Sequence, residues 1–125
     1  MDSHTSMSAA LVLFGLAALG GLVMAILRFR GRPLPPSWLA LGHGLGAGAG
    51  LTLLIYAAVT VGIPPQAQLA LGVLIAAAAG GLTMNLLFHQ KARPLPKPLV
   101  IGHGLLAVAG FLLLLVAVCG QPLVM

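Results

Sequence analysis

Hydrophobic residues run almost without interruption through four long segments of the 125-residue chain, and polar residues gather in the connections between them. Each segment offers the roughly 20 apolar residues that a helix needs to cross the hydrocarbon core of a bilayer. The pattern therefore predicts an all-α membrane protein with four transmembrane helices, folded as one transmembrane domain over residues 1–125. The predicted spans are about residues 8–27, 38–62, 67–88 and 99–119.

The composition agrees with this prediction and excludes several functions. Hydrophobic residues make up 60% of the chain and charged residues 6%, which is too little polar surface to coat a water-soluble globule. The only acidic residue is Asp2, so no span carries a carboxylate that could drive proton-coupled export or act as a catalytic acid or base. The sequence also lacks a Walker-type phosphate loop, a zinc-binding HExxH motif and an assignable catalytic triad. We therefore expect no enzymatic activity.

All the basic residues fall in two proline-rich connections. Cationic loops are retained on the cytoplasmic side, so we expect both connections in the cytoplasm and the N- and C-termini outside, in a bacterial inner membrane. The net charge of +5 then reflects topology and attraction to anionic lipid headgroups, and nucleic acid is not an expected partner. The first span has no positive residues before it and arginines after it, so we expect it to be retained and not cleaved as a signal peptide. The basic residues are Arg28, Arg30, Arg32, Lys91, Arg93 and Lys97.

The second half of the chain repeats short motifs of the first half. Because the repeating unit contains two spans, the second copy enters the membrane in the same direction as the first. We therefore predict an up-down bundle made of two parallel-repeat helical hairpins, the first over about residues 8–62 and the second over about residues 67–119. The repeated motifs are GGLVM (20–24) and GGLTM (80–84), RPLP (32–35 and 93–96), and GHG (42–44 and 102–104).

The repeat sets His43 and His103 at one depth, each about 7 to 8 Å inside the cytoplasmic start of its helix. Small residues share their helix faces, namely Gly46 and Gly50 beside His43 and Gly110 beside His103. Such faces permit close helix contact or the approach of a flat macrocycle whose iron is held by two imidazoles. Two main interpretations stay open: ligation of a b-type haem by both histidines, and structural hydrogen bonding across helix interfaces. Other metal or ligand chemistry is a third.

Several other residues could contact a cofactor, but each also has a simpler explanation. Arg28 and Arg32 are candidates to pair with haem propionates, although topology and headgroup charge already explain them. Met24 and Met84 have sulfur atoms that can bind haem iron or Cu(I), but methionine more often fills helix interfaces. His89 is expected at the membrane edge as a polar anchor, with contact to a cofactor or a quinone headgroup as the alternative.

In general plan the four spans with His43 and His103 resemble small four-helix membrane cytochromes of the b561 and ferric-reductase type. This resemblance implies a bundle that holds haem between histidines on different helices. Such cytochromes commonly carry further paired histidines, which the spans of this chain lack, so the resemblance implies at most one haem. The repeated basic RPLP loop before a histidine-bearing helix also resembles a class of small bacterial membrane proteins with a duplicated helical hairpin.

The sequence is consistent with two different kinds of function. In the first, the protein is a membrane electron carrier with one b-type haem between His43 and His103 and no enzymatic activity of its own. Its expected partners are the lipid bilayer, a membrane redox partner such as a quinone or a larger respiratory-type complex, and further copies of the same chain. In the second, the protein is a non-catalytic structural or accessory subunit of a larger membrane complex.

Overall fold

A computed structural model describes residues 1–121, and helices are the only regular secondary structure in that range. The prediction of an all-α chain is confirmed. The four main helices are long and apolar enough to cross a membrane, when α3 is taken together with the π-helix that continues it. The elements are α1 (Ser3–Phe29), α2 (Ser37–Thr60), α3 (Pro65–Met84), the π-helix η1 (Asn85–His89) and α4 (Lys97–Cys119).

The first helix extends beyond its predicted span at both ends. Asp2 is its N-cap, and the Asp2 carboxylate accepts a hydrogen bond of 2.7 Å from the Thr5 backbone N–H. A side chain that satisfies a free N–H at a helix start lets the helix begin among polar residues, which hydrophobicity alone does not predict. The same bond lowers the pKa of the Asp2 carboxyl, because it favours the charged form.

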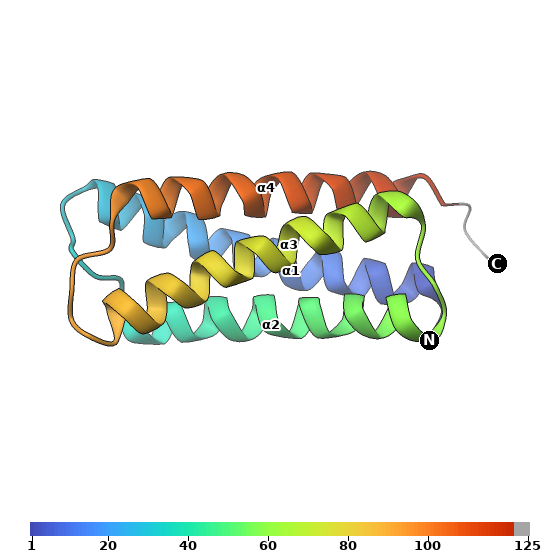
Figure 1. Cartoon of the computed structure of the whole chain (residues 1–125), viewed down its shortest axis with the longest axis horizontal. Helices are drawn as coiled ribbons and strands as arrows, with labels where there is room; N and C mark the ends of the chain where they lie inside the picture. Colours follow the sequence, from blue (N-terminus) through green and yellow to red (C-terminus); the bar gives the residue numbers. More distant parts are fainter. Residues whose placement is uncertain (122–125) are drawn as a thin grey trace.

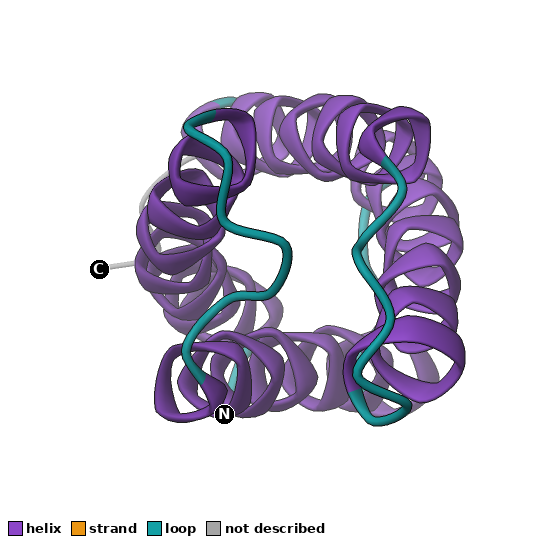
Figure 2. Cartoon of the chain, turned by 90° about the vertical axis from the view of Figure 1, so that its left-hand side faces the viewer, coloured by secondary structure: helices purple, strands orange, loops and turns teal. Residues whose placement is uncertain are grey.

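The four helices lie side by side along the long axis of the molecule (Figure 1). The connections that follow α1 and η1 lie at one end, which we call the loop end, and the α2–α3 connection lies at the other end with the N-terminus. Seen from the loop end, the helices stand at the corners of a square, and each of the two connections at this end joins neighbouring corners (Figure 2). The most extensive packing is within the pairs α1–α2 and α3–α4, and the α2–α3 contact is the smallest.

The core is built largely from small and aliphatic side chains on the inner helix faces. Leu54 and Leu114 are fully buried, and they lie sixty residues apart in α2 and α4. Gly50 and Gly110 are also sixty residues apart and lie under bulky neighbours: a Cβ built at Gly50 would be 3.2 Å from the Phe14 ring, and one at Gly110 would be 2.7 Å from Leu74 Cγ. These two glycines therefore permit close helix packing.

The π-helix accounts for a one-residue irregularity in the spacing of the repeated motifs. The methionines of the GGLVM and GGLTM motifs are sixty residues apart, but the RPLP motifs are sixty-one apart. After α1 the Arg32 N–H donates to Leu27 O, and after η1 the Arg93 N–H donates to Phe88 O, so the same turn recurs with the longer spacing. The extra residue therefore lies between Met84 and Phe88, where the helix widens into η1.

The two hairpins touch at the loop end through their connections. The Leu95 N–H donates to Pro33 O at 3.1 Å, and Arg28 Nε donates to Leu95 O at 2.8 Å. Lys97 Nζ lies 5.6 Å from the centroid of the Phe29 ring, in cation–π geometry. These contacts join the end of α1 to the connection before α4.

Candidate functional site

The two histidines of the repeated GHG motif meet inside the bundle. His43 lies on α2 and His103 on α4, which occupy opposite corners of the square and make no direct backbone contact. The ring centroids are 6.0 Å apart and the ring planes are inclined at 78°. Both side chains are half-buried. The two imidazole rings therefore lie close to each other inside the bundle.

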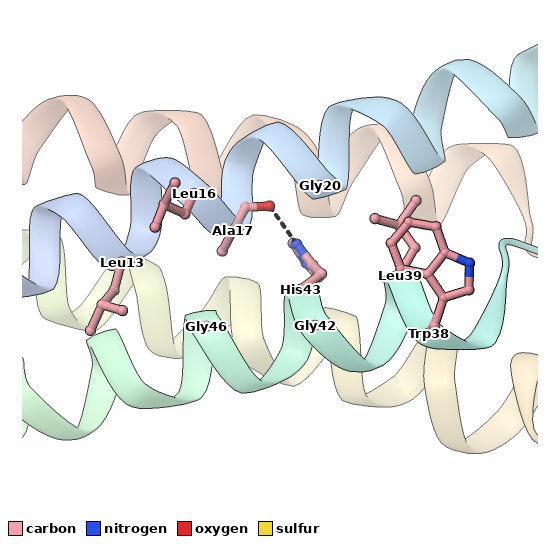
Figure 3. Close-up of a pocket in the computed structure, with 9 residues that line it drawn as sticks. All are labelled: Leu13, Leu16, Ala17, Gly20, Trp38, Leu39, Gly42, His43 and Gly46. Atoms are coloured by element: carbon pink, nitrogen blue, oxygen red, sulfur yellow. Dashed lines mark hydrogen bonds between the residues drawn. The ribbon is translucent and has the colours of Figure 1, made fainter.

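Each imidazole forms one hydrogen bond to a backbone carbonyl of the neighbouring helix in its own hairpin. His43 Nδ1 lies 2.7 Å from Ala17 O of α1 (Figure 3), and His103 Nδ1 lies 2.7 Å from Ala77 O of α3. A carbonyl oxygen can only accept, so Nδ1 carries the hydrogen and donates it. In the neutral ring the proton is then absent from Nε2, which keeps its lone pair for a ligand or a metal.

Glycine one turn after each accepting carbonyl makes room for the ring. A Cβ built at Gly21 would lie 3.0 Å from His43 Cε1, and one at Gly81 would lie 3.1 Å from His103 Cε1. In a helix the carbonyl oxygen of one residue points toward the residue four positions later, so a side chain at Gly21 would crowd the approach to Ala17 O. The preceding glycine, Gly20, is less critical, because its built Cβ would lie 3.8 Å from His43 Cβ.

A cavity of about 480 Å³ is lined by the two imidazoles and extends along the bundle from Leu51 of α2 to Arg28 and Leu95 at the loop end. Its volume falls in the range typical of small-molecule sites. The lining comes from all four helices and is mostly apolar, with a few polar groups and two thioethers. A second cavity, of about 290 Å³, lies between α1 and α2 beside His43 and Trp38 (Figure 3). The polar and sulfur-bearing residues that line the larger cavity, besides the two histidines, are Arg28, Asn85, His89, Met24 and Met84.

The glycines expected beside the histidines lie at helix interfaces. Gly46 packs against α1, where its built Cβ would be 3.6 Å from Ala17 Cβ, and it lines the smaller cavity together with His43. Gly50 and Gly110 lie deeper in the bundle and line neither of these cavities.

The two candidate arginines are in different places. Arg28 lines the larger cavity, and its guanidinium is positioned by the bond from Nε to Leu95 O. Arg32 is exposed and does not line the cavity. Among the basic residues near the loop end, the structure thus brings Arg28 to the site and leaves Arg32 outside it.

Sequence reasoning did not identify the groups that hold the imidazoles. The carbonyls of Ala17 and Ala77 have no signature in the sequence, because every residue carries a carbonyl. Gly21 and Gly81 did have a signal, the duplicated glycine pair, but its relation to the histidines depends on which helices pack together. Asn85 also lines the larger cavity, and the residue sixty positions earlier is Ala25, which has no polar side chain.

Two histidine nitrogens are too few to hold a bare metal ion, but they suit a metal whose other coordination positions are already filled. Within residues 1–121 no group of three or more histidine, cysteine, aspartate or glutamate side chains could hold a metal ion. A haem iron already has four ring nitrogens and needs only two axial ligands. Two imidazoles bound through nitrogen to one iron, at bonds of ~2 Å, have ring centroids about 6 Å apart. Metal-binding histidines also commonly donate their second N–H to a backbone carbonyl, as both do here.

Comparison with protein families, with curated proteins and with solved structures finds no match for this chain.

Proposed function

We propose that the protein is an electron carrier of the bacterial inner membrane that holds one b-type haem between His43 and His103. The observation that carries the proposal is the pair of inward imidazoles, 6.0 Å apart between centroids, with each Nδ1 bonded to a backbone carbonyl. The haem would supply reversible one-electron transfer at its iron. No catalytic step is assigned to the chain itself.

The residues around the cavity have complementary roles in this proposal. The Ala17 and Ala77 carbonyls fix the orientation of the two rings and increase the basicity of each Nε2. Arg28 provides positive charge at the loop end of the cavity, where the carboxylates of a haem could pair with it. The apolar lining excludes water from the iron, which helps to set its reduction potential.

The proposal includes duplication of a helical hairpin, arranged as an up-down bundle with two parallel repeats. Several contacts recur sixty residues apart and support it. His43 bonds to Ala17 as His103 bonds to Ala77, and Leu54 and Leu114 are buried alike. Two units with the same direction in the membrane place equivalent side chains at equal depth, as a pair of axial ligands requires.

We place the loop end in the cytoplasm and the α2–α3 connection outside, because all the basic residues lie in the two loop-end connections and the residues next to them. Alkaline phosphatase folds only outside the cytoplasm, so a fusion after Gly62 is expected to be active and a fusion after Gly31 inactive. A green fluorescent protein fusion serves as the reciprocal control and should fluoresce only after Gly31. The opposite pattern would show that the assigned orientation is inverted.

The absorption spectrum of the purified protein tests the proposed function. Protein produced in haem-sufficient cells and reduced with dithionite is expected to show a sharp α band at about 560 nm, as a low-spin b-type haem does when both axial positions are filled. Extraction as the pyridine complex should give about one haem per chain. A colourless protein that keeps its helical circular dichroism, and stays colourless when haemin is added, would exclude the proposal.

One observation favours the alternative function, a structural or accessory subunit. The bonds of His43 and His103 each close an interface within a hairpin, so both imidazoles already have a partner without any cofactor. Gly44 and Gly48 of α2 line the larger cavity but are exposed, with open space where a Cβ would be, and a helix of another subunit could approach there. A colourless, folded protein that co-purifies with a membrane complex would support this function.

A further inference from the structure

The smaller cavity is a groove on the outer surface of the first hairpin. It runs between α1 and α2 from Trp38, at the start of α2, to Gly46, about 12 Å further along that helix (Figure 3). Trp38 and Leu16, which line it, are 75% and 62% exposed. The groove therefore opens away from the bundle, and in a membrane it faces the lipid.

The lining of the groove offers contacts to hydrocarbon and few to polar groups. Among the described residues that line it, His43 and Trp38 carry polar side-chain groups, and the rest are aliphatic residues and glycines. The Nδ1 of His43 already donates to Ala17 O. Tryptophan is enriched where the hydrocarbon of a bilayer meets its headgroups, because the indole is apolar but carries an N–H donor. The groove thus suits a hydrocarbon chain whose polar end lies beyond Trp38.

Positive charge lies beyond the Trp38 end of the groove, on the same face of α1. Arg30 is the C-cap of α1, and its N–H still donates to Ile26 O, so it continues the helix. It follows the groove-lining Leu16 by fourteen residues, which is about four full turns and places both on one face. The only acidic residue of the chain, Asp2, caps the opposite end of α1. No acidic side chain of the protein is therefore within reach of Arg30.

The second hairpin repeats the positive charge but differs at both ends of the groove. Basic residues follow α1 and η1 alike. The counterpart of Gly46 is Leu106, which adds a bulky side chain, and the counterpart of Trp38 is Pro98, which has no side-chain N–H donor. The first hairpin therefore combines a basic connection with a glycine at one end of the groove and an indole at the other, and the second hairpin does not have this combination of residues.

We infer that this groove binds an anionic glycerophospholipid, with one acyl chain between α1 and α2 and the phosphate near Arg30. An acyl chain matches the apolar lining, and the phosphate supplies the negative charge that the side chains of the loop end lack. Free phosphate would leave the groove empty, and a zwitterionic lipid would bring a positive headgroup toward Arg30. The site is on the outer surface of the hairpin and does not depend on a haem being bound.

The fluorescence of Trp38 tests this inference, because Trp38 is the only tryptophan of the chain and lines the groove. The purified protein is reconstituted in phosphatidylcholine vesicles with a rising fraction of phosphatidylglycerol that is brominated in the upper part of its acyl chains, where bromine quenches a nearby indole. Half-maximal quenching is expected at a several-fold lower fraction of brominated phosphatidylglycerol than of brominated phosphatidylcholine. Equal fractions for the two lipids would overturn the inference.

Two variants that fill the groove separate binding in it from general attraction to the basic loops. Leu16→Phe enlarges a side chain at the edge of the groove, and Gly46→Leu introduces the residue of the second hairpin; each is expected to lower the preference for phosphatidylglycerol several-fold. Leu19→Phe is the matched control, because Leu19 is on the same helix, is 63% exposed and does not line the groove. If both groove variants kept their helical circular dichroism and the full preference, the inference would be wrong.

Arg30→Gln tests the charge at the headgroup end. It is expected to reduce the preference for phosphatidylglycerol about fivefold, which is the contribution of one basic residue close to an anionic surface. Lys91→Gln removes the same charge after η1, at the opposite corner of the square from the end of α1, and should leave the quenching of Trp38 unchanged. An equal loss of preference in both variants would indicate general attraction to the loop end and would also overturn the inference.

Discussion

Replacing either His43 or His103 with alanine is expected to abolish the α band of the reduced protein. Each substitution removes one of the two nitrogen donors whose rings lie 6.0 Å apart, and within residues 1–121 the protein has no third histidine, cysteine or carboxylate grouped with them. Loss of one axial ligand leaves the iron with a single protein bond and removes the low-spin spectrum. The measurement is the difference between dithionite-reduced and air-oxidised spectra, with haem content from the pyridine complex.

His4→Ala is the control for this experiment. His4 lies in the first turn of α1, away from the loop end, and does not line the cavity, so the variant should keep the full band. Circular dichroism of each variant should show the same helix content as the wild type, which separates loss of haem from loss of fold. An unchanged band in His103→Ala would contradict the assignment of that residue as an axial ligand.

One methyl group added at Gly21 or Gly81 is expected to have the second large effect, a loss of affinity for haem. Gly21→Ala and Gly81→Ala place a Cβ at 3.0 and 3.1 Å from the Cε1 atoms of His43 and His103, closer than carbon atoms normally pack. The ring must move away from the carbonyl that orients it. Loss of such an orienting partner typically weakens metal binding about 10- to 100-fold. Titration of haem into the apoprotein, followed by absorbance, measures this change.

The adjacent glycines supply a matched control. Gly20→Ala and Gly80→Ala add the same methyl group to the same helices, but the new Cβ lies 3.8 Å from the histidine Cβ, which is ordinary contact. These variants should bind haem with wild-type affinity. If Gly20→Ala and Gly21→Ala weakened binding equally, the effect would come from the helix and not from the imidazole position.

Hydrophobicity was sufficient to predict the helices because their length and apolar composition are fixed by the thickness of a bilayer. The ends were less predictable. α1 begins at Ser3 because Asp2 caps it, and α3 continues beyond Met84 as the π-helix η1, where the spacing of the shared motifs is longer by one residue. This irregularity was visible in the sequence only as the change in spacing of the RPLP motif.

The candidate site was predicted in part. His43 and His103 could be found because a polar residue repeated within apolar spans is unusual, and the structure brings their rings together. The carbonyl partners and the role of Gly21 could not be found, since they depend on which helix faces pack. Arg28 and Arg32 looked alike in the sequence, but they separate in space because α1 ends between them and Arg32 follows the turn at Gly31.

The extra residue in η1 affects which sides of the protein present the same surface to molecules in the membrane. Two identical hairpins would give a particle with the same face on opposite sides, equally accessible to any molecule that diffuses in the plane of the membrane. The one-residue difference in motif spacing at η1, together with differing side chains such as Gly15 and Ile75, makes two opposite sides of the protein unlike each other.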